Sequence, residues 1–238
     1  MKKNIFIGIL LLVAGVASAQ ERTTSLGFNV GFAEPVMYYR ASSSAEKLTR
    51  QATDGFKLGV IYETTIVKGF GVSSSLNYTH SAHMGSWTVT PGISALQTKE
   101  DHNMHQLEIP VDWQYKFLIA KRTYLALYTG PTMQIGLANT FRYREKLNGE
   151  VIKDEKVDAY KIDEDHDGIP DYNRVNVTWG IGLGFHYKQY FLRGGYDFGL
   201  MSVYKDKYFN TSSDSGWNRK GRMDQWQIKL GIYFWQFE

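Results

Sequence analysis

The sequence predicts an all-β fold: an eight-stranded antiparallel up-and-down transmembrane β-barrel with short periplasmic turns and long extracellular loops. Apolar and polar residues alternate at period two in eight segments, which is the pattern of strands with one buried face. The connections between these segments are alternately short and long, and aromatic residues reach 15% while charged residues stay at 21%. An even number of strands joined in this way is typical of outer-membrane barrels.

The strands are expected, in chain order, over residues 26–32, 56–62, 72–78, 107–117, 125–137, 175–188, 190–200 and 225–234. The segment 175–188 is the clearest, because seven apolar side chains alternate with seven small or polar ones. The segment 72–78 is the weakest, because Ser74 interrupts its apolar face. Pro110 falls within 107–117, although proline removes a ladder donor and is disfavoured inside a sheet.

The connections complete the topology. Tight turns are expected at about 64–69, 119–122 and 188–189, and long polar loops at about 41–54, 81–103, 138–174 and 203–223. Because short and long connections alternate, all the long loops should emerge at one end of the barrel. The longest, at about 138–174, is expected to be an acidic surface loop.

The first 19 residues predict a cleaved signal peptide. Lys2 and Lys3 precede an apolar stretch, and Ala17-Ser18-Ala19 supplies a small-residue cleavage site. Residues 20–238 would then form one barrel domain, exported through the Sec pathway. Without the two lysines the formal charge falls from +3 to +1, which excludes a broad basic surface for nucleic acid. The chain has no cysteine, so disulfides and a thiol nucleophile are also excluded.

The polar face of the strands predicts which side faces lipid. It is mostly Gly, Ser, Asn, Gln and Thr, whereas a soluble lipocalin-like barrel, the alternative, would show water many Lys and Glu residues. An eight-stranded interior is just wide enough for side chains, and buried charges need partners there. We therefore expect a lumenal charge network of four cations and four anions: Lys57, Lys116, Arg193, Lys229, Glu63, Glu108, Asp112 and Asp197. The opposite face is aromatic and aliphatic, which suits the lipid of a Gram-negative outer membrane.

Two segments carry a family resemblance. Residues 106–117 read QLEIPVDWQYKF, and residues 124–131 read YLALYTGP. They resemble the Leu-Glu-Ile-Pro strand and the following Gly-Pro strand of small "porin family" or PorT-like outer-membrane barrels of Bacteroidota. Residues 190–200 are similar to the next-to-last strand of that family. The resemblance implies the same barrel, a tolerated Pro110, and a role in type IX secretion as one alternative function.

The sharpest local motif is residues 163–171, Asp-Glu-Asp-His-Asp-Gly-Ile-Pro-Asp. Acidic residues at positions 1, 3, 5 and 9, with Gly at position 6, suit oxygen ligands wrapped around one Ca²⁺. The motif resembles the calcium repeats of thrombospondin type 3 and related bacterial adhesins. The expected ligands are the carboxylates of Asp163, Asp165, Asp167 and Asp171 and the carbonyl of Ile169. Arg174 stands where an EF-hand has a bidentate Glu, so a single weak site is expected, with a solvated acidic loop as the alternative.

Few residues are grouped in a way that suggests catalysis. His80-Ser81 could form a nucleophile and base at the rim of the barrel, as in a lipid hydrolase, but no third member is evident. We therefore expect no enzyme, and a membrane anchor whose surface loops make contacts in adhesion, partner docking or envelope support. The alternatives are a component of the type IX secretion machinery, a narrow pore and the rim hydrolase. The expected partners are outer-membrane lipid and envelope or secretion proteins, with no nucleic acid.

Overall fold

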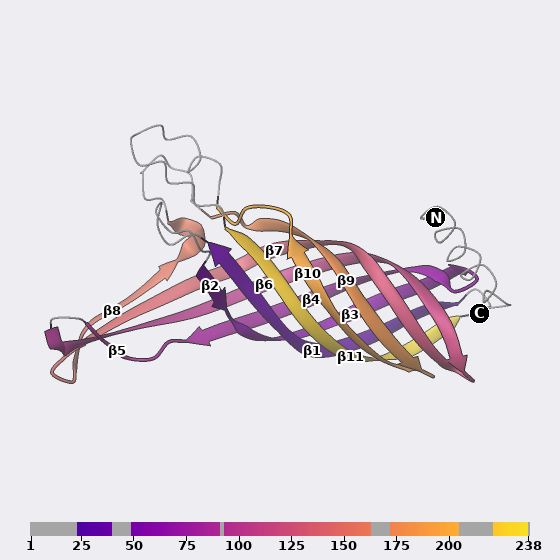
Figure 1. Cartoon of the computed structure of the whole chain (residues 1–238), viewed down its shortest axis with the longest axis horizontal. Coiled ribbons are helices and arrows are strands. Elements are labelled where there is room, and N and C mark those ends of the chain that lie inside the picture. The colour runs from indigo at the N-terminus through magenta and orange to yellow at the C-terminus, as the bar shows by residue number, and fades with distance from the viewer. Residues whose placement is uncertain (1–22, 40–48, 91–92, 163–171, 205–220, 238) are drawn as a thin grey trace, which may run out of the picture.

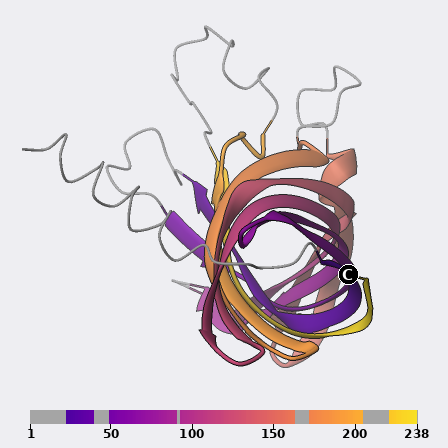
Figure 2. The same ribbon diagram turned by 90° about the vertical axis from the view of Figure 1, so that its right-hand side faces the viewer.

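The computed structural model describes residues 23–39, 49–90, 93–162, 172–204 and 221–237. Eight antiparallel strands form a closed ring, seen from the side in Figure 1 and from one end in Figure 2. In ring order they are β1 (Thr24–Tyr39), β3 (Asp54–Val67), β4 (Phe70–Met84), β6 (Ile93–Ala120), β7 (Thr123–Leu147), β9 (Val175–Tyr187), β10 (Tyr190–Gly199) and β11 (Arg222–Phe237). The predicted eight-stranded up-and-down barrel is confirmed.

The last strand closes the barrel on the first. β11 pairs antiparallel with β1 from Thr24↔Phe237 to Tyr38↔Arg222, with one register shift between Leu26 and Gly27. Closure gives every strand of the ring two neighbours, so no backbone edge is left open where lipid would surround it.

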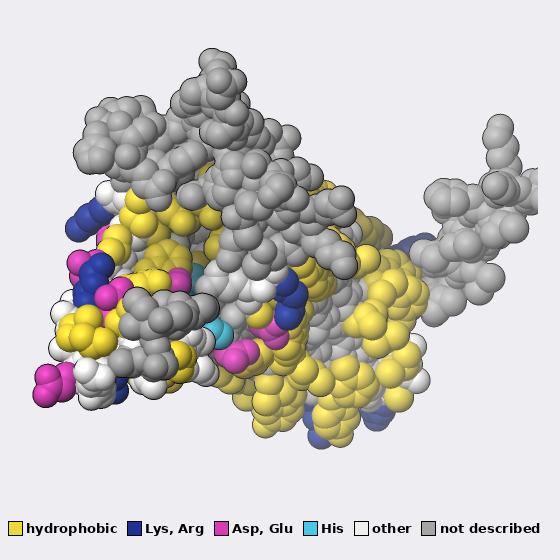
Figure 3. All heavy atoms as spheres, turned by 60° about the vertical axis from the view of Figure 1, so that its left-hand side comes forward, with side chains coloured by type: hydrophobic (Ala, Val, Ile, Leu, Met, Phe, Trp, Pro, Cys, Tyr) yellow, Lys and Arg dark blue, Asp and Glu magenta, His cyan; other side chains and the backbone are white. Residues whose placement is uncertain are grey.

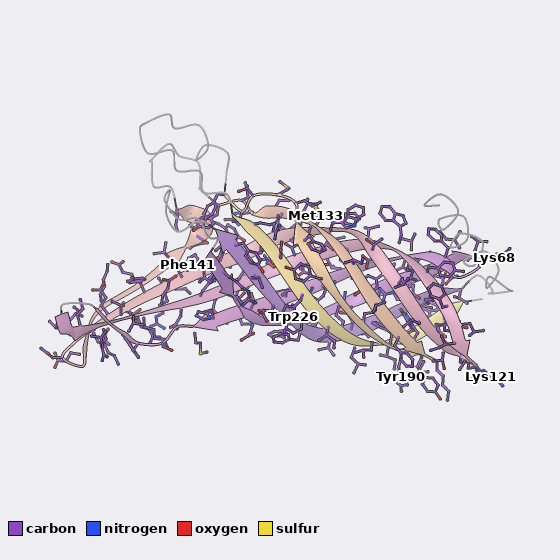
Figure 4. The ribbon with its side chains drawn as sticks, in the orientation of Figure 1. Lys68, Lys121, Met133, Phe141, Tyr190 and Trp226 are labelled. Carbon is purple, nitrogen blue, oxygen red and sulfur yellow. The ribbon has the colours of Figure 1, made fainter. Side chains whose placement is uncertain are left out.

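Tight turns join the strands at one end of the ring. The β3–β4 turn is formed by Lys68 and Gly69, whose φ values of 44° and 84° match the left-handed conformation of a two-residue hairpin turn. Lys121 and Arg122 join β6 to β7, and residues 188–189 join β9 to β10. Figure 4 shows Lys68, Lys121 and Tyr190 together at this end of the molecule.

Two of the predicted loops consist largely of strands that continue the strands of the barrel. Residues 81–103 continue β4 to Met84, add β5 (Thr88–Thr90) and then begin β6. Residues 138–174 continue β7 to Leu147 and return as β8 (Glu150–Asp158), followed by the short 3₁₀ helix η1 (Ala159–Lys161). The prediction of long polar loops was wrong there because these extensions leave the barrel and carry many charged residues, with too few apolar residues to give the sustained alternation used to find strands. A further short strand, β2 (Thr49–Ala52), pairs with β1.

The barrel is apolar outside and polar inside. Its outer side chains include Phe28, Leu58, Leu76, Ile181 and Leu230, each about half exposed. Its inner side chains are buried and mainly charged, amide or hydroxyl groups. Figure 3 shows hydrophobic side chains covering the barrel, whereas charged side chains of both signs gather on the projecting end. This arrangement places the apolar surface where lipid can cover it and the polar core in the lumen.

Candidate functional site

A buried ion pair spans the lumen, farther from the short turns than the other charged cluster. Lys57 on β3 and Glu108 on β6 are almost inaccessible to water, and Lys57 Nζ lies 2.5 Å from Glu108 Oε2. Lys57 also donates a hydrogen bond to Gln227 Oε1 at 2.7 Å, and Thr79 donates to Glu108 Oε1 at 2.6 Å. The pair therefore ties together β3, β6 and β11, which are not neighbours in the ring.

Glu63 is the centre of a second cluster nearer the short turns. Its carboxylate accepts hydrogen bonds from Arg193 Nη2 at 2.6 Å and from the Tyr233 hydroxyl at 2.7 Å. Lys116 forms an ion pair with the other carboxylate oxygen. Arg193 also donates to Gln114 Oε1 at 2.5 Å, so one guanidinium on β10 joins an anion on β3 and an amide on β6 across the lumen.

The remaining predicted lumenal charges are placed differently. Asp197 accepts a hydrogen bond from Gln227 Nε2 at 2.8 Å. Asp112 and Lys229 are buried, and within the described residues neither has an ion-pair partner within 4 Å. Direct ion pairs thus join five of the eight predicted charges, and neutral groups link several of them. Sequence reasoning did not single out these neutral groups, although their inward positions were readable from the alternation: Ser73, Thr79, Gln114, Gln227 and Tyr233.

A polar sheet projects beyond the barrel at the opposite end from the tight turns. It consists of β5, the start of β6, the end of β7, and β8, and Figure 1 shows it extending well past the ring. Phe141, labelled in Figure 4, marks the place where β7 leaves the barrel. Asn148 and Gly149, with φ values of 51° and 88°, make the turn at its tip.

Ion pairs connect the strands of this projecting sheet. Arg142 on β7 donates two hydrogen bonds to Asp154 on β8, at 2.8 and 2.6 Å. These bonds lower the pKa of the Asp154 carboxyl. Partial burial raises the pKa of Asp101, but hydrogen bonds from Arg144 and Lys99 outweigh it and lower this pKa. The sheet therefore carries opposite charges that join β6, β7 and β8.

The mouth of the barrel, where the projecting sheet begins, contains a small pocket. Its volume is about 50 Å³, and it has an apolar wall and a polar wall. Met37, Met104 and Met223 belong to the apolar wall, and Val203 lies in the same hydrophobic cluster as Met104 and Met223. The polar wall consists of His102, Gln106, Gln134, Asn139 and Asn176, on the three adjacent strands β6, β7 and β9.

Tyr160 on η1 packs into this mouth beside Gly136. A Cβ atom at position 136 would collide with the Tyr160 hydroxyl group, so glycine is what lets the ring enter. The guanidinium carbon of Arg174 lies 4.9 Å from the centre of the same ring. Burial raises the pKa of Tyr160 to about 12, so its hydroxyl stays protonated at neutral pH.

Of the other two predicted sites, only the rim pair lies within the described residues. The expected calcium ligands, residues 163–171, lie outside the described residues. His80 and Ser81 point to opposite sides of the wall: Ser81 faces the lumen, while His80 stacks on His105 outside, with ring centres 4.5 Å apart. The structure therefore does not form the rim pair. Among the described residues no three His, Asp or Glu side chains are grouped to hold a metal ion.

The comparisons with known proteins define the class. The chain belongs to the outer membrane protein β-barrel domain family, whose model matches residues 18–205. It is thus an outer-membrane β-barrel in a lipid environment, and the soluble lipocalin-like alternative was wrong. Within the part of the chain that the structure describes, no helix is long and apolar enough to cross a membrane. Comparison with curated proteins gives no significant match.

Several solved structures are similar at low sequence identity. One is Ail, the attachment invasion locus protein of Yersinia pestis, in complex with the heparin analogue sucrose octasulfate (14% identity, TM-score 0.44, covering 92% of this chain and 100% of that chain). Another is Neisserial surface protein A (12%, 0.37, 87% and 97%). A third is the outer membrane protease OmpT from Escherichia coli (8%, 0.41, 92% and 100%). The family match, and not these similarities, identifies the class.

Proposed function

We propose that this protein is an outer-membrane anchor that displays a contact surface on the projecting sheet and does not act as a general diffusion pore. The observation that carries the proposal is the continuation of β6 and β7 beyond the lipid-facing band, with β8 added to β7 through Arg142 and Asp154. A barrel that only filled the membrane would not need strands of 28 and 25 residues, because about 10 residues span the bilayer.

The lumen supports the second half of this proposal. The ion pairs of Lys57 with Glu108 and of Arg193 with Glu63 lie within an interior that is just wide enough for side chains. A solute crossing the barrel would have to separate these buried pairs and leave charges without partners, which costs several kcal/mol per ion. The barrel is therefore a support for its outer surface.

Attachment tests this function directly. The full chain is displayed in the outer membrane of a strain that lacks surface adhesins, beside a variant in which residues 143–156 are replaced by a short Asn-Gly turn. We expect the variant to keep its heat-modifiable gel mobility and to lose autoaggregation or retention on coated surfaces. Unchanged attachment would refute the proposed contact surface. A secretion defect with unchanged attachment would support the type IX alternative instead.

Three finer statements remain predictions alongside this proposal. They are the relationship to PorT-like barrels of Bacteroidota, export through the Sec pathway, and envelope or secretion proteins as partners. The motif-bearing strands 106–117 and 124–131 correspond to parts of β6 and β7, the two strands that carry the projecting sheet.

A further inference from the structure

A polar cavity lies at the projecting sheet, beside β5. Its volume of about 300 Å³ is at the lower end of the range for ligand pockets, about 300–1,000 Å³. It adjoins the smaller mouth pocket, because Gln51 and His102 line both. Together they form a groove that leads from the projecting sheet into the barrel mouth. The larger cavity is lined by Gln51, His83, Gly85, Ser86, Thr88, Thr98, Lys99, Glu100, His102 and Tyr143.

The lining of the larger cavity is suited to a neutral, hydroxyl-rich ligand. Ser86, Thr88 and Thr98 provide hydroxyl groups, and Gln51 provides an amide. Among the described residues of its lining, only Lys99 and Glu100 carry a fixed charge, and Lys99 is already paired with Asp101 at 3.3 Å. A polyanion would therefore find no unpaired cation in this described lining, whereas a polyol could both donate and accept hydrogen bonds along the wall.

Unpartnered polar atoms continue this wall into the mouth. His102 Nε2 is within 2.5 Å of Asn139 Oδ1, which makes Nε2 the donor and leaves Nδ1 as a buried acceptor. Within the described residues Nδ1 has no partner, and the same holds for Gln106 Oε1, Gln134 Nε2 and Asn176 Oδ1. These side chains are at least nine-tenths buried. Because a buried polar group without a hydrogen-bond partner is unfavourable, ligand hydroxyl groups placed here would gain stabilising hydrogen bonds.

Aromatic rings line the same groove. The rings of His102 and Phe141 are stacked, with centres 4.3 Å apart and planes within 9°. Tyr143 follows two residues later, so its side chain is on the same face of β7, and it remains 41% exposed. The C–H face of a pyranose ring packs well on an exposed aromatic ring while its hydroxyl groups bond to the surrounding polar side chains.

We infer that this groove binds a neutral oligosaccharide, with one or two sugar rings in the cavity beside Tyr143 and hydroxyl groups directed toward His102. The inference rests on the proposed contact function and gives it a ligand class. Tyr143, Thr98 and His102 take part in none of the ion pairs of the projecting sheet, so those pairs can remain intact when the ligand binds.

Binding is tested with the full chain in phospholipid nanodiscs, since maltoside and glucoside detergents would themselves compete. Maltotriose, N,N′,N″-triacetylchitotriose and mannotriose are titrated by calorimetry, with a fully sulfated heparin fragment as the anionic comparison. We expect at least one neutral trisaccharide to bind, and Tyr143→Ala to weaken its affinity at least tenfold. Thr98→Val, which removes one hydroxyl at nearly constant volume, should weaken binding by a smaller factor. Tyr190→Ala, at the other end of the barrel, is the matched control and should change nothing.

Two results would overturn this inference: binding of none of the three trisaccharides, or equal binding by the wild type, Tyr143→Ala and Thr98→Val. Tighter binding of the sulfated fragment than of any trisaccharide would overturn the inference that the ligand is neutral. The attachment assay distinguishes failure of the oligosaccharide inference from failure of the proposed contact function. If the 143–156 deletion abolishes attachment although no trisaccharide binds, the contact surface stands and its ligand is of another class. If the deletion leaves attachment unchanged, the contact function itself fails.

Discussion

At the scale of single residues, the Lys57–Glu108 pair shows how a polar lumen can stabilise a barrel. Both side chains are buried, and each has a second partner, Gln227 for the ammonium and Thr79 for the carboxylate. Such a pair contributes little compared with a well-packed apolar substitute, but removing one partner leaves the other charge buried without compensation. The cost of a single substitution is therefore larger than the net contribution of the pair.

This reasoning predicts the outcome of a double-mutant cycle. Lys57→Met should lower the free energy of unfolding by about 3 kcal/mol or more, because Glu108 is left as an unpaired buried anion. Lys57→Met combined with Glu108→Leu should cost less than Lys57→Met alone. Urea unfolding in lipid vesicles, followed by tryptophan fluorescence, measures the free energy of unfolding of the wild type, the two single variants and the double variant. A double variant whose loss equals the sum of the two single losses would show that the residues do not interact.

At the scale of elements, the projecting sheet should lose stability at a higher pH, as acid is added, than the barrel strands that lack carboxylates. The pKa of Asp154 and that of Asp101 are lowered in the folded sheet, so their stabilising effect is fully present above the unfolded value of about 3.9. It is lost as the pH falls through the folded pKa values. Hydrogen exchange, corrected for intrinsic rates, should show constant protection of residues 142–156 from pH 7 to pH 5 and a decrease below about pH 4.

The matched variant for this experiment is Asp101→Asn with Asp154→Asn. Its protection of residues 142–156 should be lower at neutral pH and should change little on acidification. β9, which contains no Asp or Glu, serves as the internal reference. Equal acid sensitivity in the wild type and the double variant would show that these two carboxylates do not hold the sheet.

The same sheet marks the limit of what the sequence could predict. Strands with one apolar face, such as β9, can be predicted from alternation alone. The same alternation predicts which side chains face lipid and which face the lumen. In β8, by contrast, six of nine residues are charged, and their pairing depends on β7. One local signal was available: Asn148-Gly149 is a strong two-residue hairpin turn, and it indicates a hairpin inside the expected loop.

The calcium motif is a second element whose role stays a prediction from the sequence. Its ligands would be the Asp side chains of residues 163–171 and the carbonyl of Ile169, with a dissociation constant of about 10⁻⁴–10⁻³ M, as in extracellular calcium modules. Calorimetric titration of Ca²⁺ into chelator-treated protein should give a signal that Asp165→Ala with Asp167→Ala abolishes. Asp154→Ala, an acidic residue outside the motif, should leave the signal intact. No heat of binding up to millimolar Ca²⁺ would favour a solvated acidic loop.

At the scale of the whole molecule, the ring could be predicted but the details of its interior could not. Strand number, closure and the inward position of eight charges follow from period two and from the connection lengths. Which charges meet is decided by the relative heights of strands that are not neighbours, as with Arg193 on β10 and Glu63 on β3. That height depends on the register and tilt of the closed barrel, which no single strand specifies.

The filled interior leads to a prediction for conduction. The wild-type barrel, reconstituted in a planar bilayer, should give no stepwise current, because Arg193, Glu63 and Gln114 meet across the lumen. Arg193→Ser combined with Glu63→Ser removes one charge of each sign and two large side chains, so it should admit small ions and water. Faster gel mobility of the unboiled sample verifies that the variant still forms a closed barrel. Discrete wild-type conductance would contradict the filled lumen, and a silent, correctly assembled variant would place the barrier elsewhere along the lumen.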